Sequence, residues 1–289
     1  MPDSLTPPTL SPLLTGLVFP ESPRWHEGRL WLADWGAEEV IAVDVEGKSE
    51  VVAQVASFPF SIDWLPDGRL VAVSARERRL LRREADGSFV AHAELSGLSK
   101  WPWNEIVVDG RGNIYLNNIG FDFPGGDFAP GIVALVTADG AVRQVADGVA
   151  FPNGMAVTAD NSTLVLAESY GKRLTAFDIE TDGTLSNRRV WAELGDGVPD
   201  GLCIDAEGAV WYADVPNQRC VRVSEGGEVL GTVPLDRGCF ACMLGGPLGT
   251  TLFIVANYWA GTAAAALSEP TRTGQVVAVE APAPAAGWP

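Results

Sequence analysis

Phe151-Pro152-Asn153-Gly154-Met155-Ala156-Val157, near the middle of the chain, is the stretch from which the fold is best inferred. Its proline and glycine indicate a tight turn, and an apolar run begins directly afterwards. Asn153 carries a carboxamide whose oxygen suits a hard cation and whose NH2 group donates hydrogen bonds. A second strand-like run, Arg173 to Ile179, is followed by the turn Thr181-Asp182-Gly183. The unit is therefore a polar residue, an apolar strand, and further strands joined by turns.

This unit recurs about six times at a period of ~40 to 50 residues, with about four short strands in each copy. The copies contain Gly28–Asp34, Pro66–Val73, Asp109–Leu116, Glu207–Asp214 and Leu252–Asn257, besides the stretch above. One copy cannot bury both faces of its sheet, so neighbours must stack in a ring. We therefore predict an all-β fold, a six-bladed β-propeller with four antiparallel strands in each blade.

The chain ends suggest how the ring closes. Leu10 to Phe19 can form one strand, and we expect it to complete the last blade beside Gly274–Val279. The third copy carries a long insertion, Gly120 to Gly131. The predicted organisation is a loose N-terminal tail at 1–9, a single propeller domain at 10–280 and a C-terminal tail at 281–289.

Composition excludes several classes of protein. The formal net charge of −17 argues against nucleic acid as a partner, because phosphates would be repelled. No apolar run approaches ~18 residues, so we predict no membrane span. The start, Met1 to Leu14, lacks a basic segment, so we predict no secretory signal. These features favour a cytoplasmic protein that acts on a small molecule, and they leave the oligomeric state open.

Four cysteines are present, at Cys203, Cys220, Cys239 and Cys242. The last two have CxxC spacing, but no second close pair and no nearby histidine completes a zinc set. We interpret all four as buried and reduced.

The residues that open the six inner strands should share one end of the ring and face its channel. They are Glu21, Ser61, Asn104, Asn153, Asp200 and Cys239 or Phe240. One Asn or Asp before a strand is commonly only a turn residue. Four oxygen donors at the same point of four copies, Glu21, Asn104, Asn153 and Asp200, instead favour a metal site. We predict one divalent cation, with calcium preferred and magnesium, manganese or zinc as alternatives.

The ordered motifs Glu21-Ser22-Pro23-Arg24-Trp25, Asn104-Glu105, Phe151-Pro152-Asn153-Gly154 and Pro199-Asp200-Gly201 are similar to those of a known family. The chain resembles the senescence-marker-protein, gluconolactonase and luciferin-regenerating-enzyme-like family over residues 17 to 280. This resemblance implies a six-bladed propeller with one axial divalent cation, and in many members the hydrolysis of lactones. It implies Glu21, Asn153 and Asp200 as ligands, with Asn104 ligating directly or binding a metal-held water or substrate. Diisopropylfluorophosphatase and the paraoxonases are similar in architecture and ligand set.

One departure from the family bears on the substrate. Sugar-lactone members usually carry an arginine two residues before the position of Asn104, and here that residue is Pro102. A site without those donors loses much of its discrimination for polyols, so we predict a rather apolar lactone. The candidate substrate-binding residues are Asn104, Glu105, Asn118, Trp101, Trp103, Phe121 and Tyr258. Packing between blades is the alternative role for the aromatic ones.

Asp200 is the candidate catalytic residue, as a base toward water or as a nucleophile. The chain has only His26 and His92, which we interpret as structural, so a Ser-His-Asp triad lacks a candidate base. The leading hypothesis is a metal-dependent lactonase or carboxylic-ester hydrolase. The alternatives are phosphotriester hydrolysis on the same metal, a non-enzymatic binding propeller with a structural cation, and metal-assisted C–C or C–N chemistry of the strictosidine-synthase-like type.

Overall fold

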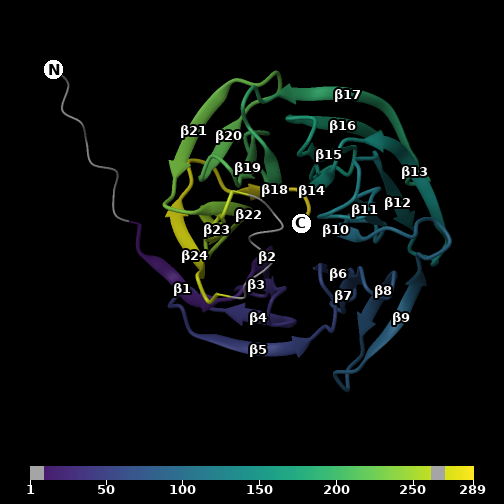
Figure 1. The fold of residues 1–289 in the computed structure, drawn as a ribbon, viewed down its shortest axis with the longest axis horizontal. Coiled ribbons are helices and arrows are strands. Elements are labelled where there is room, and N and C mark those ends of the chain that lie inside the picture. The colour runs from purple at the N-terminus through teal and green to yellow at the C-terminus, as the bar shows by residue number, and fades with distance from the viewer. Residues whose placement is uncertain (1–9, 262–270) are drawn as a thin grey trace.

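Six small antiparallel sheets are arranged in a ring around one axis (Figure 1). The structure is a computed structural model that describes residues 10–261 and 271–289. The chain passes from blade to blade in sequence order, and in blades 1 to 5 the first strand lies nearest the centre. The predicted six-bladed propeller is confirmed, while the tail predicted at 1–9 lies outside the described residues.

The first three blades each contain four consecutive strands, ordered from the axis outward. Blade 1 contains β2 (Pro20–His26), β3 (Arg29–Asp34), β4 (Glu39–Val43) and β5 (Ser49–Gln54). Blade 2 contains β6 (Phe60–Trp64), β7 (Leu70–Ser74), β8 (Arg79–Arg83) and β9 (Phe89–Glu94). Blade 3 contains β10 (Trp103–Val108), β11 (Ile114–Asn118), β12 (Gly131–Val136) and β13 (Val142–Val149).

The remaining blades follow the same order, and the last one joins the two ends of the chain. Blade 4 contains β14 (Pro152–Val157), β15 (Thr163–Glu168), β16 (Arg173–Ile179) and β17 (Leu185–Glu193). Blade 5 contains β18 (Pro199–Asp205), β19 (Val210–Asp214), β20 (Arg219–Val223) and β21 (Val229–Pro234). Blade 6 contains β22 (Gly238–Gly245), β23 (Thr251–Asn257), β24 (Gly274–Glu280) and β1 (Pro12–Leu17). Pairing of β1 with β24 closes the ring as predicted, with Leu17 opposite Gly274.

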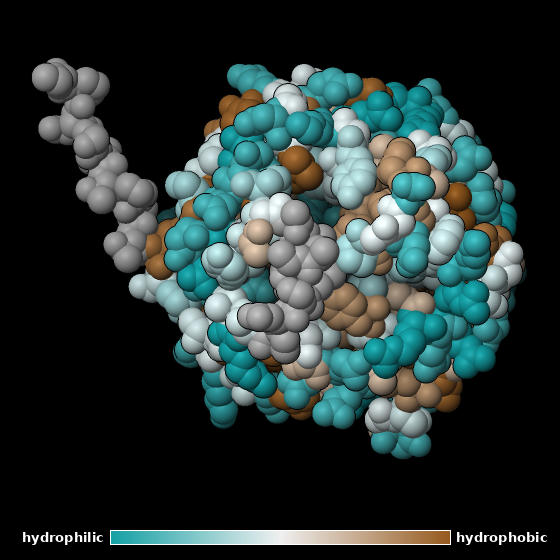
Figure 2. Space-filling model, viewed as in Figure 1, coloured by the Kyte–Doolittle hydropathy of each residue, from teal (hydrophilic) through white to brown (hydrophobic). Residues whose placement is uncertain are grey.

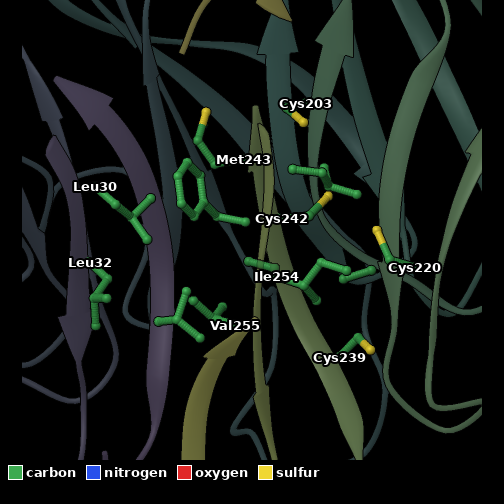
Figure 3. Close-up of a cluster of buried hydrophobic side chains, with 14 of the residues drawn as sticks. Leu30, Leu32, Cys203, Cys220, Cys239, Cys242, Met243, Ile254 and Val255 are labelled. Atoms are coloured by element: carbon green, nitrogen blue, oxygen red, sulfur yellow. The ribbon is translucent and has the colours of Figure 1, made fainter. Parts of the chain in front are cut away.

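Apolar side chains between blades hold the ring together. The largest cluster joins blades 5, 6 and 1 and includes Leu30, Leu32 and Ile254 (Figure 3). All four cysteines lie in this cluster, and each is free and buried, as the sequence predicted. Burial raises the pKa of the Cys239 thiol, so the unreactive neutral form is favoured.

The last residues of the chain pair with inner strands rather than leaving the ring. The two-residue strand β25 (Ala285–Ala286) pairs with β18, with Ala286 opposite Ile204. Trp288 exchanges two backbone hydrogen bonds with Val157 of β14, at 2.7 and 2.8 Å. Because Val157 and Ile204 lie late in their strands, this C-terminal segment sits at the end of the ring opposite Asn153 and Asp200. Within the described ranges, no helix is long and apolar enough to cross a membrane.

Candidate metal and substrate site

Four oxygen donors from four blades line one cavity of about 730 Å³. They are Glu21 of β2, Asn104 of β10, Asn153 of β14 and Asp200 of β18. The Asn104 amide nitrogen lies 3.5 Å from the Asn153 amide oxygen, so these two side chains are direct neighbours. Each donor stands within the first two residues of its strand, and all four therefore meet at the same end of the ring.

Each of these four strands departs from regular pairing at its donor. Register shifts fall in β2 between Glu21 and Arg24, in β10 between Trp103 and Ile106, in β14 between Pro152 and Met155, and in β18 between Pro199 and Leu202. Strand β6 of blade 2 pairs regularly, and its Ser61 does not line the cavity. Bulges re-aim side chains next to binding sites, and here they turn the donors toward the axis.

A buried polar residue at the end of the second strand fixes the segment that leads to each donor. Asp34 accepts hydrogen bonds from the backbone amides of Val18 and Phe19, at 2.9 and 2.7 Å. Glu168 accepts from Ala150 at 2.8 Å, and Asp214 accepts from Val198 at 3.2 Å. These contacts fall two or three residues before Glu21, Asn153 and Asp200, so they set where each donor strand begins.

In blade 3, Asn118 fixes the segment that leads to the donor Asn104. Its amide nitrogen donates to the carbonyl oxygens of Trp101 and Pro102, at 2.7 and 2.9 Å. Its amide oxygen accepts from Ser99 and Gly120. The side chain is therefore engaged with the protein and does not line the cavity, although the sequence interpretation placed it at the substrate.

The two carboxylates of the cavity are electrostatically strained. Burial raises the pKa of Glu21 well above its ordinary value, and the negative charges of Asp200 and Glu105 raise it further. Burial likewise raises the pKa of Asp200, with the Glu105 charge as the next contribution. One Asp200 carboxylate oxygen, Oδ1, is buried and has no hydrogen-bond partner. A buried unpaired oxygen is costly, and a cation in this position would satisfy it.

These residues fit a hard divalent cation. Two carboxylates and two carboxamides are oxygen ligands of the kind that calcium and magnesium take. No group of three or more His, Cys, Asp or Glu arranged to hold a metal occurs at residues 10–261 and 271–289. A cation at the axis would therefore depend on Asn104 and Asn153 as well as on the two acids.

Apolar side chains form most of the cavity wall, and the aromatic ones among them belong to two clusters. The first combines Phe19, Trp35, Phe58, Phe240 and Trp259, and within it Phe19 stacks on Trp35 at 5.4 Å. The second, over blades 3 and 4, combines Phe121, Phe123, Phe128, Phe151 and Tyr170. In the view down the ring, hydrophobic surface lies beside the centre over blades 2 to 4 (Figure 2). No lysine, arginine or histidine is among the described residues that line the cavity.

The other predicted substrate residues are not among those that line the cavity. Trp103 is fully buried in the core between blades 2 and 3, and Trp101 packs under the Lys100 ammonium group. Phe121 lies behind Phe123 and Phe151, while Tyr258 is exposed and its neighbour Trp259 lines the cavity instead. Glu105 is buried, and it is bound by Arg24 and by the hydroxyl of Ser61.

Cavity residues that the sequence interpretation missed occupy two repeated positions. One position is two residues before the axial residue, and it holds Phe19, Pro59, Pro102, Phe151 and Val198. The other directly follows the polar end of the second strand, and it holds Trp35, Ile119, Ser169 and Val215. The sequence interpretation considered the first position only at Pro102. Counting back two residues from the axial residue in the other copies would have identified the other four residues at this position.

The two histidines lie outside the cavity lining. His26 stacks on Trp64 at 4.2 Å, and burial lowers its pKa. His92 lies beside the Arg82 guanidinium group, and burial together with that positive charge lowers its pKa. Both positions agree with a structural role.

The fold and the four axial oxygen donors point to one family of six-bladed propellers. Residues 19–258 match the SMP-30/gluconolactonase/LRE-like region, and the chain belongs to this family. It is 30% identical to a regucalcin from Danio rerio over 86% of each chain. It is 28% identical to the pentonolactonase XacC of Haloferax volcanii, over 81% of this chain and 80% of that protein. The crystallographic structure of a luciferin-regenerating enzyme shares the fold, with a TM-score of 0.81, 22% identity and coverage of 95% and 96% of the two chains.

Proposed function

We propose that this protein is a divalent-metal-dependent hydrolase of lactones or related cyclic esters, and that it prefers apolar substrates to sugar lactones. The observation that carries the proposal is the unpartnered Asp200 oxygen, buried beside Glu21 in an aromatic-walled cavity. Similarity to a pentonolactonase supports lactone chemistry, and similarity to regucalcins supports calcium as the first cation to test.

Glu21, Asn104, Asn153 and Asp200 would hold the cation. When bound, it would polarise the substrate carbonyl and make water more acidic. Ser169 orients one ligand, because its hydroxyl donates to the Pro199 carbonyl at 2.7 Å and lies 3.4 Å from the Asn153 amide nitrogen. With its nitrogen held there, Asn153 keeps its amide oxygen on the side of Asn104, whose amide nitrogen lies 3.5 Å away. The Asp200 carboxylate would take the proton of the attacking water, or attack the carbonyl itself.

The cavity wall supports the apolar preference. Pro102 lines the cavity where sugar-lactone members usually have an arginine, and Trp35 and Phe151 present rings to it. A polyol would leave most of its hydroxyl groups without partners against this wall, whereas an alkyl or aryl substituent would bury apolar area.

The test is kcat/KM for a hydrophobic lactone, a sugar lactone and a phosphotriester on one preparation with calcium in excess. We expect the hydrophobic lactone to be preferred and Asp200→Asn to lower its rate by ~10²- to 10⁴-fold. Asp67→Asn removes an exposed carboxylate and is the matched control that should keep full activity.

The other outcomes discriminate between the alternatives. Preference for the sugar lactone would contradict the role given to Pro102, and preference for the phosphotriester would move the protein to that class of hydrolase. No turnover of any substrate by calcium-loaded protein would favour a binding propeller. Elemental analysis of dialysed protein should find about one divalent cation per chain, as one set of oxygen ligands predicts.

A further inference from the structure

Arg24 is a buried arginine that connects three blades behind the axial donors. It lies three residues after Glu21 in β2 and is 5% exposed. Its guanidinium group donates to the Pro23 carbonyl of blade 1 at 2.9 Å. The same group lies 3.9 Å from the Asp63 carboxylate of blade 2. It reaches blade 3 through Glu105 and Ile106, at 2.9 and 2.7 Å.

The contacts of Glu105 are concentrated on one oxygen. Glu105 Oε1 accepts from Arg24, from the Ser61 hydroxyl and from the backbone amide of Ile106 at 3.0 Å. Ser61 is held in turn by the Ser22 hydroxyl at 2.7 Å. Arg24 of blade 1 and Ser61 of blade 2 thus hold the Glu105 carboxylate against the two preceding blades.

The position of the Glu105 carboxylate matters because other negative charges lie at the axis. Glu21 and Glu105 are buried and Asp200 is partly buried at the same end of the channel, and among the described residues Arg24 is the basic group that pairs with one of these three carboxylates. Glu105 directly follows Asn104 inside the register shift of β10, where strict alternation of faces is lost, and its negative charge acts on both Glu21 and Asp200. A released Glu105 side chain would therefore compete for the same cation. A third carboxylate would raise cation affinity and occupy space that substrate or water needs.

We propose that Arg24 is a positioning residue that holds Glu105 out of the coordination sphere, so that the axial cation is bound by Glu21, Asn104, Asn153 and Asp200 alone. This inference rests on the proposed metal-dependent function. In this proposal, Arg24 keeps space at the cation available for substrate or water, in addition to any contribution to stability.

The test is a double-mutant cycle in calcium affinity, measured by titration calorimetry on wild type, Arg24→Met, Glu105→Gln and the double variant. Arg24→Met should raise calcium affinity about tenfold, because the freed carboxylate adds a charged ligand, and should lower kcat on the lactone. Glu105→Gln should then cost at least about tenfold more affinity in the Arg24→Met background than in wild type.

Three results would overturn the inference. A purely structural role predicts that Arg24→Met weakens calcium binding. A purely Coulombic role predicts that the fold-changes in calcium affinity of the two single variants multiply to that of the double variant, within about threefold. If wild type does not bind calcium, both the proposed function and this inference are contradicted. If wild type binds calcium but the effects of the two substitutions on affinity are additive, only this inference is contradicted.

A control and a second variant guard against loss of folding. Arg222→Met removes another buried arginine, paired with Asp205 at 2.7 Å in blade 5, and should lower Tm without changing calcium affinity. Arg24→Lys keeps the charge but loses the planar fork that reaches both Glu105 and Ile106. If Arg24→Met does not fold, the same cycle on Arg24→Lys must still show non-additivity for the inference to stand.

Discussion

At the scale of single residues, Asp63 shows what it costs to bury charge around this axis. Its two oxygens accept from the backbone amides of Trp64 and Val108, at 2.8 and 2.7 Å, and Arg24 lies nearby. Burial nevertheless outweighs these favourable contacts and raises the pKa of Asp63 to about 6. The folded protein therefore keeps a proton that the unfolded chain releases near pH 4.

Asp63 should make the protein less stable as the pH rises from about 4 to 6. In that window the folded state binds more protons than the unfolded state, so the free energy of unfolding falls by about 3 kcal/mol for a two-unit shift. Asp63→Asn should flatten this part of the pH dependence, even though losing one acceptor lowers stability overall.

Urea unfolding at pH 4.5, 5.5 and 6.5 in the presence of chelator measures the slope directly. Asp67→Asn, which changes an exposed carboxylate, should keep the wild-type slope. Equal slopes for wild type and Asp63→Asn would show that folding does not raise the pKa of Asp63.

At the scale of elements, the strand repeat was predictable, whereas side-chain direction was only partly so. The oxygen donors were found because they recur at one point of an internal repeat. Trp103 was placed near the substrate because it flanks Pro102 in a segment expected at the mouth, yet its ring lies in the core between blades 2 and 3. The C-terminal segment 281–289 is rich in Pro and Ala, and its pairing with β14 and β18 depends on strand edges that no local pattern reveals.

Asp34 allows a test of how the second strands position the donors. Asp34→Ala removes the acceptor for the Val18 and Phe19 amides, and hydrogen bonds to charged groups contribute about 1.5 to 3 kcal/mol each. We expect a Tm lower by roughly 6 to 24 °C and weaker calcium binding, since Glu21 follows two residues after Phe19.

Ser74→Ala is the matched control, because Ser74 ends β7 of blade 2, which supplies no donor. Its hydroxyl accepts from the Glu77 amide at 3.2 Å, so a small loss of stability with unchanged calcium affinity is expected. A similar loss of calcium affinity in both variants would contradict a specific effect of Asp34 on Glu21.

At the scale of the whole molecule, the ring is closed in two places and bridged in a third. Strand β1 joins β24 at the rim, and β25 with Trp288 joins blades 4 and 5 at the end of the channel opposite the donors. A cation held by Glu21, Asn104, Asn153 and Asp200 would join blades 1, 3, 4 and 5 at the other end. Cation binding should therefore stabilise the ring as a unit rather than one blade.

Removal of the cation should lower the Tm of the whole protein in one cooperative transition. The unfolded chain has no assembled site, so calcium at about a hundred times its Kd stabilises the fold by ~2.7 kcal/mol, or roughly 5 to 10 °C in Tm. Scanning calorimetry with calcium and then with chelator measures this difference. Glu21→Gln should shrink it, because one of the two charged ligands is lost. An unchanged Tm after verified metal removal would mean that the four blades are not joined through the axis, and that the buried carboxylates are tolerated without a cation.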